Sequence, residues 1–554
     1  MSRPVRRIGL CVISVAFYAC TSIGAAPDRL SEKAAVVPLP VSIQRSDGFF
    51  FIKPSTQVVA EGKAAAEASK LIDALGPAIG YRLGLVKDSP RVGNVVGLKV
   101  EPSLEEHLGE EGYELEVRPQ SVFIRAGKPA GLFYGMQTLR QLLPSAIFSK
   151  QRVEQIEWTV PCVHIIDYPR FRWRGLLIDP ARHFIPVRDV EQFIDLMALH
   201  KFNRLQMHLT DDQGWRVEIK KYPLLTQIGA RMDFTTMQRE VAGGQVDGRI
   251  VGGFYSQDDI RRLVRYAAER YITIVPEIEM PAHTGAAIVS YPQIGLYAEK
   301  LNTLPPEERW TAHERVLAPR PQTVTFMQEV LAEVMELFPG SYIHIGGDEA
   351  DTNHWRQSEE MKALMGRLGL KDEAELHSWF IKQMDAFVSQ RGRRLVGWDE
   401  ILQGGLAPGA TVMSWRGQAG GITAAQAGHD VVMAPTSHTY FDYYQSLEKT
   451  EPRAIGGHIP LEKTYEFEPV PETLTVDQAK HVLGGQGQLW GEYIAGRKHL
   501  EYMTYPRAAA LSEVLWSGRE DRNYELFLIR LTEHLKRLGA AEVNYRALDK
   551  SPIR

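Results

Sequence analysis

Hydrophobic and polar positions follow two different rhythms along this chain. In the first part, Tyr113, Leu115 and Val117 alternate with acidic residues, and a second β-prone run at 122–126 follows a polar turn. This alternation is typical of a β-hairpin. Apolar residues then recur at near-helical spacing between 132 and 143. The first part of the chain therefore predicts a small α+β domain.

From about residue 170 onward, short apolar strands alternate with amphipathic helices. Apolar residues at i, i+3, i+4 and i+7 mark the helices, and Ser256 followed by Asp259 predicts the N-cap of one of them. Eight strands alternating with helices predict a (β/α)8 TIM barrel of the α/β class, and we expect the helical stretch from 505 to about 538 to close it. The predicted strands are at 175–179, 204–209, 272–278, 342–346, 394–398, 411–414, 430–434 and 484–489.

The N-terminus has the composition of a secretory signal peptide. Three arginines within residues 1–7 precede an apolar run from Ile8 to about Ala19, and small residues then lead to Ala26. The run is shorter than the ~20 residues of a spanning helix, so we expect export and no membrane span. Residues 17–20 are also similar to a bacterial lipoprotein cleavage box, which leaves a lipid anchor at Cys20 as an alternative.

The composition limits the cellular compartments and the binding partners that are compatible with this chain. The 554 residues carry 64 Lys plus Arg against 68 Asp plus Glu, so no basic excess exists for binding nucleic acid. Removal of the signal peptide leaves Cys162 as the single cysteine, and no Asn-x-Ser/Thr site is present, which favours a periplasmic or outer-membrane-associated bacterial protein. We divide the chain into a signal peptide (1–26), an α+β domain (27–165), a catalytic barrel (166–540) and a C-terminal tail (541–554).

The carboxyl ends of the predicted strands carry carboxylates, one arginine and three tryptophans. In a barrel these ends meet at one face, where catalytic groups are found. Aromatic rings stack on the C–H face of a sugar, while carboxylates and arginine bind its hydroxyls, so the set predicts a pocket for a neutral polyhydroxylated ring. Its members are Asp179, Arg182, His183, Thr210, Asp211, Asp212, Glu279, His283, Asp348, Glu349, Trp398, Asp399, Glu400, Trp415, Tyr440, Phe441, Asp442, Trp490 and Glu492.

Several polar residues also fit purely structural roles. An aspartate after a strand is often the N-cap of the next helix, which applies to Asp211 and Asp212. His344 lies inside a predicted strand and fits a buried core histidine. Arg174 precedes its strand, which places it at the opposite end of the barrel from the catalytic face.

A metal or nucleotide site is the main chemical alternative. His208, Asp211, His283 and Asp348 can in principle meet around a divalent ion, but the sequence lacks the histidine spacings of metal-dependent hydrolases. It also lacks a Gly-x-Ser-x-Gly elbow and a Gly-rich phosphate loop, which disfavours a serine nucleophile and an open nucleotide-binding sheet. We therefore expect neither a metal nor another cofactor.

The run YIHIGGDE at 342–349 resembles the signature of family 20 glycoside hydrolases, the β-N-acetylhexosaminidases. The resemblance covers about residues 38–516 and implies a small α+β domain followed by a catalytic barrel. Seven further blocks are similar to the family in the same order: LIDPARHF at 177–184, MHLTDDQGW at 207–215, PEIEMPAH at 276–283, VGWDE at 396–400, SW at 414–415, YFD at 440–442 and WGE at 490–492.

The resemblance implies a role for each matching residue. Glu349 corresponds to the general acid/base, and Asp348 to the residue that holds and polarises the 2-acetamido group of the substrate. Tyr440 corresponds to the residue that binds the acetamide carbonyl oxygen. Trp398, Trp415 and Trp490 correspond to the box around the acetamide methyl and the ring. Sugar hydroxyls would be bound by Arg182, Asp442 and Glu492, and Asp211 with His283 would form a polar relay behind the acid.

The implied reaction is exo-acting and retaining, with the acetamide oxygen of the substrate as nucleophile and an oxazolinium intermediate. It requires Asp348 ionised and Glu349 protonated, so we expect their pKa values to diverge in that sense. The expected partners are N-acetylhexosamine-terminated oligosaccharides or glycoconjugates. A family relative that releases a disaccharide and a non-catalytic glycan-binding barrel are the alternatives, and residues 291–321 either shape further subsites or pack on the surface.

Overall fold

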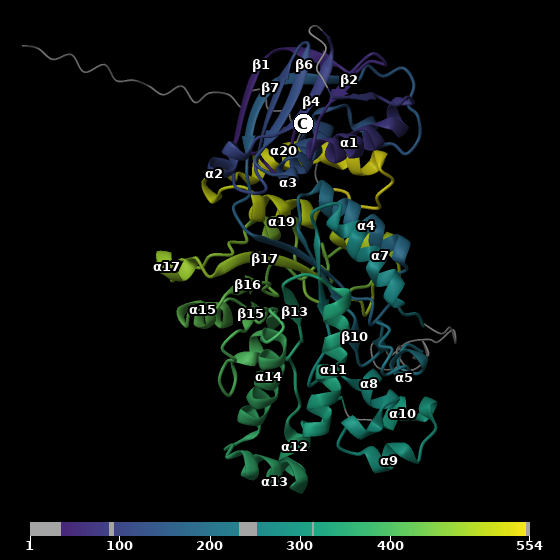
Figure 1. Cartoon of the computed structure of the whole chain (residues 1–554), viewed down its shortest axis with the longest axis vertical. Helices are drawn as coiled ribbons and strands as arrows, with labels where there is room; N and C mark the ends of the chain where they lie inside the picture. Colours follow the sequence, from purple (N-terminus) through teal and green to yellow (C-terminus); the bar gives the residue numbers. More distant parts are fainter. Residues whose placement is uncertain (1–34, 88–92, 232–251, 313–314, 550–554) are drawn as a thin grey trace, which may run out of the picture.

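The computed structural model describes residues 35–87, 93–231, 252–312 and 315–549. The predicted signal peptide and Cys20 lie outside this part of the chain. Two domains stack along the long axis of the molecule, with the sheet of the first domain at the top of Figure 1. Cys162, in the first domain, is buried and unpaired.

The first domain contains a seven-stranded mixed sheet in the order β1-β7-β5-β6-β4-β2-β3. The predicted hairpin is confirmed, because β5 and β6 pair antiparallel with Leu115 opposite Ile124. Helices α1 and α3 pack on this sheet. The strands are β1 (Ser42–Phe51), β2 (Gln57–Val59), β3 (Gly84–Val86), β4 (Val95–Val100), β5 (Tyr113–Arg118), β6 (Ser121–Ala126) and β7 (Thr159–Asp167), and the helices are α1 (Ala64–Ile79), η2 (Pro102–Leu104), α2 (Glu105–Leu108), α3 (Pro129–Leu142) and η3 (Ser145–Phe148).

The second domain is the predicted TIM barrel. Eight parallel strands close on themselves in the order β8-β9-β12-β13-β14-β15-β16-β17, with β17 paired to β8. Each of the eight predicted strands is present; β14 and β15 have the predicted bounds, and the ends of the others differ by one or two residues. They are β8 (Trp173–Ile178), β9 (Arg204–His208), β12 (Thr273–Glu277), β13 (Tyr342–His344), β14 (Arg394–Trp398), β15 (Thr411–Ser414), β16 (Val431–Met433) and β17 (Val482–Leu489), and a small ribbon of β10 (Thr210–Asp211) and β11 (Gly214–Trp215) follows β9.

Helices α4, α7, α11, α14 and α15 pack around the barrel between its strands. Residues 291–321, expected to be a long loop, contain three short helical segments. The described helices that follow β8 are α4 (Val187–Leu199), α5 (Leu224–Gln227), α7 (Gln257–Ala268), α8 (Gly285–Ser290), η4 (Pro292–Ile294), α9 (Ala298–Asn302), α10 (Pro306–Ala312), α11 (Pro321–Leu337), α12 (Asn353–Gln357), α13 (Glu359–Leu368), α14 (Glu373–Ser389), η5 (Asp399–Leu402), α15 (Ala419–Gln426), α16 (Leu461–Tyr465), α17 (Val476–Ala479), α18 (Arg497–Thr504), α19 (Arg507–Trp516), η6 (Arg519–Asp521) and α20 (Tyr524–Ala540).

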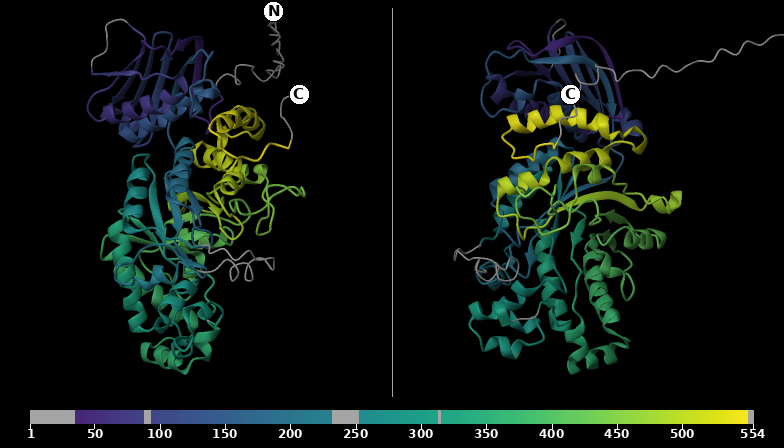
Figure 2. Two further views of the ribbon diagram at one scale, coloured as in Figure 1. Left: turned by 90° about the vertical axis from the view of Figure 1, so that its right-hand side faces the viewer. Right: turned by 180° about the vertical axis from the view of Figure 1, so that it is seen from behind.

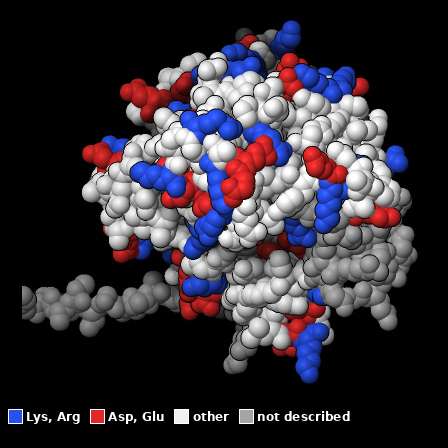
Figure 3. Space-filling model, turned by 90° about the horizontal axis from the view of Figure 1, so that it is seen from below, with Lys and Arg blue, Asp and Glu red and all other residues white. Residues whose placement is uncertain are grey.

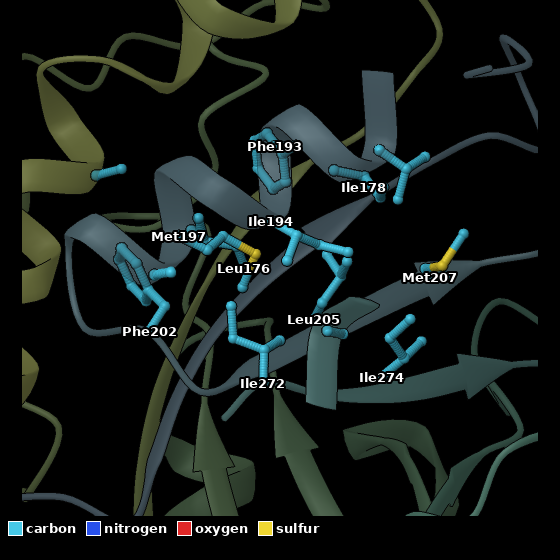
Figure 4. Close-up of a cluster of buried hydrophobic side chains, with 14 of the residues drawn as sticks. Leu176, Ile178, Phe193, Ile194, Met197, Phe202, Leu205, Met207, Ile272 and Ile274 are labelled. Carbon is cyan, nitrogen blue, oxygen red and sulfur yellow. The ribbon is translucent and has the colours of Figure 1, made fainter. Parts of the chain in front are cut away.

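The apolar stripe of α4 shows why the helical pattern produces this packing. Phe193, Ile194 and Met197 point from the helix onto side chains of the neighbouring strands (Figure 4). All three are essentially inaccessible to solvent, as are Leu176 and Leu205 beneath them. Burial of each such side chain contributes about 1.5–3 kcal/mol. The predicted N-cap of α7 is also confirmed, since Ser256 and Asp259 form a capping box.

The C-terminal helices differ in part from the expectation that they close the barrel. Helix α19 packs on β8 and β17, as expected. Helix α20 instead packs against η3 of the first domain, and Arg537 Nη2 donates a hydrogen bond to the carbonyl oxygen of Gln141 at 2.6 Å. Figure 2 shows α20, in yellow, beside the first domain. An amphipathic pattern predicts a buried face but does not identify the domain that covers it.

Two buried histidines link α20 to α4, and they make stability depend on pH. His534 Nε2 lies 2.8 Å from Nε2 of His200, and burial lowers the pKa of His200 to about 4. Below pH 6.5 the unfolded chain binds a proton that the folded chain excludes, so the free energy of unfolding is expected to fall by about 3 kcal/mol between pH 6.5 and 4. His534→Leu should make the fall in Tm between pH 7.5 and 5 shallower than it is in the wild-type protein. Equal slopes in the two proteins would contradict this assignment.

The surface agrees with the near balance of acidic and basic residues. On the face in Figure 3, lysines and arginines are interspersed with aspartates and glutamates in small groups. Within the described residues, none of the helices combines the length and the apolar character that a membrane span needs.

Candidate active site

A pocket of about 360 Å³ brings together all eleven residues to which the sequence analysis gave a role. It lies among the carboxyl ends of the barrel strands. His208 also lines it, although the sequence pointed to this residue only as a potential metal ligand. The remaining lining residues follow β16 and had no signal in the sequence, because a long loop brings them over the pocket. They are Tyr443, Ile455, Gly456 and Gly457.

The turn after β13 presents the two adjacent carboxylates. Gly346 and Gly347 have φ values of +67° and +91°, and Glu349 has φ +48°. Residues other than glycine rarely adopt this left-handed backbone, and the surrounding structure must hold them there. The turn buries Asp348 and leaves the Glu349 side chain 57% exposed, so the two carboxylates occupy different environments.

Two features require glycine at position 346: the positive φ angle and a side chain that lies very close to the Cα atom. A Cβ atom at this position would overlap the carboxylate of Glu279, which is buried below the turn. Gly346→Ala is therefore expected to destabilise the fold by at least about 2 kcal/mol, through backbone strain and steric overlap. Gly366→Ala in α13 is the matched control, because nothing lies within 4 Å of its added Cβ. Thermal denaturation checks the difference, and equal Tm values would contradict it.

A relay of partly buried His283 and buried Asp211 connects Glu349 to the base of the pocket. His283 Nε2 lies 3.4 Å from Glu349 Oε2, and His283 Nδ1 lies 3.3 Å from Asp211 Oδ1. Burial alone would lower the pKa of His283, but Asp211 and its other carboxylate neighbours raise it well above the usual range. His283 is therefore a cation between carboxylates. The structure brings the predicted relay residues together.

Asp211 contacts two further basic side chains and lies in strand β10, so the alternative that it is a helix N-cap is wrong. Its Oδ2 atom lies 2.8 Å from Arg182 Nη2 and 2.7 Å from His208 Nε2. Although burial favours the protonated form, Arg182 and His283 hold the pKa of Asp211 well below its usual range. Asp212 is not the N-cap of the next helix either, since its carboxylate instead accepts a hydrogen bond from the backbone N–H of Gly285 at the start of the more distant α8.

Arg182 is positioned from three sides. Its Nε donates to Gln213 at 3.0 Å and its Nη1 to Asp179 at 2.9 Å, and Nη1 lies 3.8 Å from Glu492. A guanidinium has five N–H donors, so donors remain for a ligand. Arg174 lies away from the pocket, where its guanidinium contacts Glu111 of the first domain. This agrees with the expectation that Arg174 sits at the opposite end of the barrel.

Three tryptophans and Tyr440 form the aromatic wall of the pocket. The indole N–H groups of Trp398 and Trp415 donate to Glu277 and Glu400, each at 2.9 Å, which fixes the ring planes. Trp490 lies 5.7 Å from Trp398 between ring centroids. Tyr440 stacks with Trp415 at 6.2 Å and an interplanar angle of 25°. These preset ring faces suit a ligand that has both apolar and polar edges.

Three carboxylate oxygens in the pocket are buried without a hydrogen-bond partner among the described residues. They are Asp348 Oδ1, Asp442 Oδ1 and Glu492 Oε2. Burial raises the pKa of all three carboxyl groups, most strongly at Asp442, where Glu492 adds to the effect. Buried polar atoms are normally paired, and an unpaired one costs about 1–3 kcal/mol. The pocket is therefore prepared for a ligand that donates several hydrogen bonds.

The pKa values of the carboxylate pair correct the expectation from the sequence. The hydrogen bond from His283 lowers the pKa of Glu349, whereas burial raises the pKa of Asp348. The values diverge, but in the unliganded pocket they do so in the opposite sense to the one expected. The reason lies in the tertiary structure, because the ring of His283 lies beside the exposed carboxylate of Glu349, whereas the carboxylate of Asp348 is buried.

Among the residues that the structure describes, two carboxylate–histidine groups have the spacing of a metal site. One is His208 with Glu277 and Glu279, and the other is His283 with Asp211 and Asp212. Although burial lowers it, Glu277 and other carboxylates raise the pKa of His208 to about 10. A protonated imidazole has no lone pair for a metal, so both histidines act here as cations within a carboxylate network.

Comparison with known proteins identifies the family. The model of the glycosyl hydrolase family 20 catalytic domain matches residues 171–519, and the model of family 20 domain 2 matches residues 33–168. The chain belongs to glycosyl hydrolase family 20. The family 20 chain is 40% identical to a β-hexosaminidase of Porphyromonas gingivalis over 513 residues, which are 92% of this chain and 64% of that relative. It is also 32% identical to a β-N-acetylhexosaminidase of Cellulomonas fimi, over 90% of this chain and 93% of that one.

Solved structures of the family have the same fold. The exo-β-N-acetylglucosaminidase of Vibrio harveyi in complex with N-acetylglucosamine superposes with a TM-score of 0.82 at 33% identity, covering 94% of this chain and 79% of that chain. A mutant β-hexosaminidase of Streptomyces plicatus in complex with GlcNAc gives a TM-score of 0.78 at 30% identity, covering 93% and 97%. These matches confirm a TIM barrel preceded by a family 20 second domain.

Proposed function

We propose that this family 20 chain is an exo-acting, retaining β-N-acetylhexosaminidase that removes terminal non-reducing β-linked GlcNAc or GalNAc. The observation that carries the proposal is the set of unpaired carboxylate oxygens of Asp348, Asp442 and Glu492 in a tryptophan-lined pocket. An N-acetylhexosamine supplies one N–H and several O–H donors to such a set, and its acetamide methyl and ring suit the aromatic wall. The exposed carboxylate of Glu349 stands at the same pocket.

In this proposal each polar group has one task. The N–H of the 2-acetamido group donates to Asp348, and Tyr440 donates its O–H to the acetamide carbonyl oxygen. The sugar hydroxyls bind Asp442, Glu492 and the remaining donors of Arg182. Glu349 protonates the glycosidic oxygen as the bond to the leaving group breaks.

The acetamide oxygen of the substrate is the nucleophile. It attacks the anomeric carbon, the leaving group departs with the proton from Glu349, and an oxazolinium ion forms. Water, deprotonated by Glu349, then opens this ion on the same face from which the aglycone left, so the configuration is retained. The single acid beside a buried orienting carboxylate fits this route, because no second carboxylate has to act as nucleophile.

Substrate binding reverses the order of the two pKa values. The positive charge that develops on the acetamide nitrogen lies next to Asp348 and lowers its pKa, which offsets the effect of burial. The aglycone covers Glu349 and removes water from its carboxylate, which raises its pKa. The acid is thus exposed and easily reprotonated between turnovers and becomes a proton donor when the pocket is occupied.

The two alternatives have less support. A disaccharide-releasing relative needs space beyond the first sugar, whereas Arg182, Asp442 and Glu492 line a pocket of about 360 Å³. A purely glycan-binding barrel does not need an exposed carboxylate coupled to a histidine–aspartate relay. None of the described residues in 291–321 lines this pocket.

Hydrolysis of 4-nitrophenyl β-GlcNAc by the purified chain tests the proposal, with the matching β-glucoside as control. We expect rapid release from the N-acetyl substrate and almost none from the glucoside, which lacks the internal nucleophile. Equal rates on both would contradict acetamide participation. No release from a folded protein that still binds GlcNAc would favour the binding or disaccharide-releasing alternative.

We also propose that the chain is exported, either by cleavage near Ala26 or as a lipoprotein anchored at Cys20. The support is the arginine-rich start followed by an apolar run and small residues. Mass spectrometry of the mature N-terminus from a bacterial host decides between the two forms. An intact Met1 would contradict both.

A further inference from the structure

A second cavity, of about 530 Å³, lies at the junction of the two domains. Its wall is formed by residues of α1, α3 and η3 from the first domain and by residues of α4 and α18 from the barrel, with the end of α7 between them. It shares no lining residue with the catalytic pocket. Its volume lies within the range of about 300–1,000 Å³ that is typical of small-molecule sites.

Each carboxylate that lines this junction cavity already has a basic partner, although Asp195 and Glu269 share Arg270. Each of these four carboxylates lies within 4 Å of a basic nitrogen. The pairs are Asp73 with Arg82, Asp195 with Arg270, Glu269 with Arg270, and Glu501 with Arg497. Two lining lysines are paired in the same way, Lys70 with Glu67 and Lys150 with Glu542. These pairs leave no carboxylate available for a further cation in the wall.

Arg140 is the exception among the described lining residues. It has no carboxylate within ion-pair distance, and its buried Nε atom has no hydrogen-bond partner. Its Nη1 donates to Gln137, and its guanidinium lies 4.6 Å from the centroid of the Phe148 ring. Burial lowers the pKa of Arg140 to about 10, against a smaller opposing effect of the more distant Asp195, so the group is still a cation at neutral pH. The cavity thus contains one positive charge without a counter-ion in contact with it.

Gln192 of α4 supplies a second unpaired group. Its side-chain oxygen is buried and accepts no hydrogen bond from the described residues. The cavity wall therefore offers a planar cation with free N–H donors from the first domain and a free acceptor from the barrel. Water can satisfy the amide oxygen, but it does not neutralise the guanidinium.

We propose that the junction cavity binds a small hydroxylated carboxylate of the sugar-acid class, with its carboxylate on Arg140 and a hydroxyl donating to Gln192. Arginine pairs with carboxylates through parallel N–H···O hydrogen bonds, which are among the strongest in proteins. A single cation that no carboxylate contacts matches a monovalent anion better than a phosphate dianion. A ligand held by both residues bridges the two domains and stabilises their junction.

Isothermal titration of the full chain with D-glucuronate tests this proposal, with D-glucose and acetate as comparison ligands. Glucuronate is expected to bind and to raise Tm, acetate to bind more weakly, and glucose not to bind. Arg140→Gln should weaken glucuronate binding at least tenfold, because a charge-assisted pair is lost. Gln192→Leu should weaken binding of glucuronate but not of acetate. Lys150→Gln is the matched control, since this wall lysine is 55% exposed and already paired.

Three results would overturn the proposal: no heat with millimolar glucuronate, equal binding of glucose, or unchanged glucuronate binding to Arg140→Gln. The last would place the sugar acid elsewhere, for instance at Arg182. Arg140→Lys serves if the glutamine variant does not fold. This variant keeps the charge but loses the planar pair of donors, so it should bind glucuronate more weakly than the wild-type protein does. An unchanged affinity would overturn the proposal.

Discussion

Glu349→Gln is expected to lower kcat on β-linked N-acetylhexosaminides by about 10²–10⁴-fold, the usual contribution of a general acid. The fold should be unaffected, because this side chain is 57% exposed and its main contact is with His283. Glutamine occupies nearly the same volume but donates no proton to the leaving oxygen. The measurement is kcat on chitobiose, together with Tm for both proteins.

The leaving group separates acid catalysis from a general disturbance of the pocket. A 2,4-dinitrophenolate departs without protonation, so the loss in the bond-breaking step should be much smaller on 2,4-dinitrophenyl β-GlcNAc than on chitobiose. Glu359→Gln is the control, since Glu359 is 88% exposed in α13 and outside the pocket. An equal loss on both substrates would contradict the assignment of Glu349 as the acid.

Asp348→Asn is expected to reduce kcat by about 10²–10³-fold, comparable to the removal of one preorganised electrostatic group. Asparagine still fits beside the acetamide but does not stabilise the positive charge of the oxazolinium ion. The free energy of unfolding at pH 7 should not fall with this substitution and is expected to rise. Burial raises the pKa of Asp348, so its charged form lowers the free energy of unfolding as pH rises through that pKa, and a neutral amide removes this cost at pH 7.

Parallel measurements of kcat and Tm therefore test the role of Asp348. The expected pattern is a large fall in kcat on 4-nitrophenyl β-GlcNAc with an unchanged or higher Tm at pH 7. Activity within tenfold of wild type would remove the assigned role. A fall in Tm that accompanies the loss of activity would instead indicate a structural defect at the turn that follows Gly347.

The hydrophobic pattern of each segment was sufficient to predict the barrel, because its strands and helices have the spacing of apolar residues that is typical of each element. The strands at 394–398 and 411–414 were predicted to the residue, and each has a pair of buried apolar residues near its centre, Leu395–Val396 and Val412–Met413. The pocket followed from the same topology. In a closed parallel barrel all strand ends meet at one face, so residues as distant as Arg182 and Glu492 must converge there.

Other features depend on contacts between segments that are far apart in the sequence. The face of α20 packs on η3 of the first domain, which no helical period specifies. Tyr443 and Gly457 reach the pocket through an irregular loop without a pattern.

The sequence by itself determined the barrel and its preceding domain, because periodicity and strand order are properties of the chain. Its resemblance to family 20 identified eleven of the residues that line the pocket. The pKa values of these pocket residues, by contrast, depend on the tertiary structure. The position of the His283 ring lowers the pKa of Glu349 and burial raises that of Asp348, in the opposite sense to the expectation. The tertiary structure likewise decided that Arg140 faces a cavity without a counter-ion in contact with it. A pKa depends on distance and burial in three dimensions, and neither is encoded in local pattern.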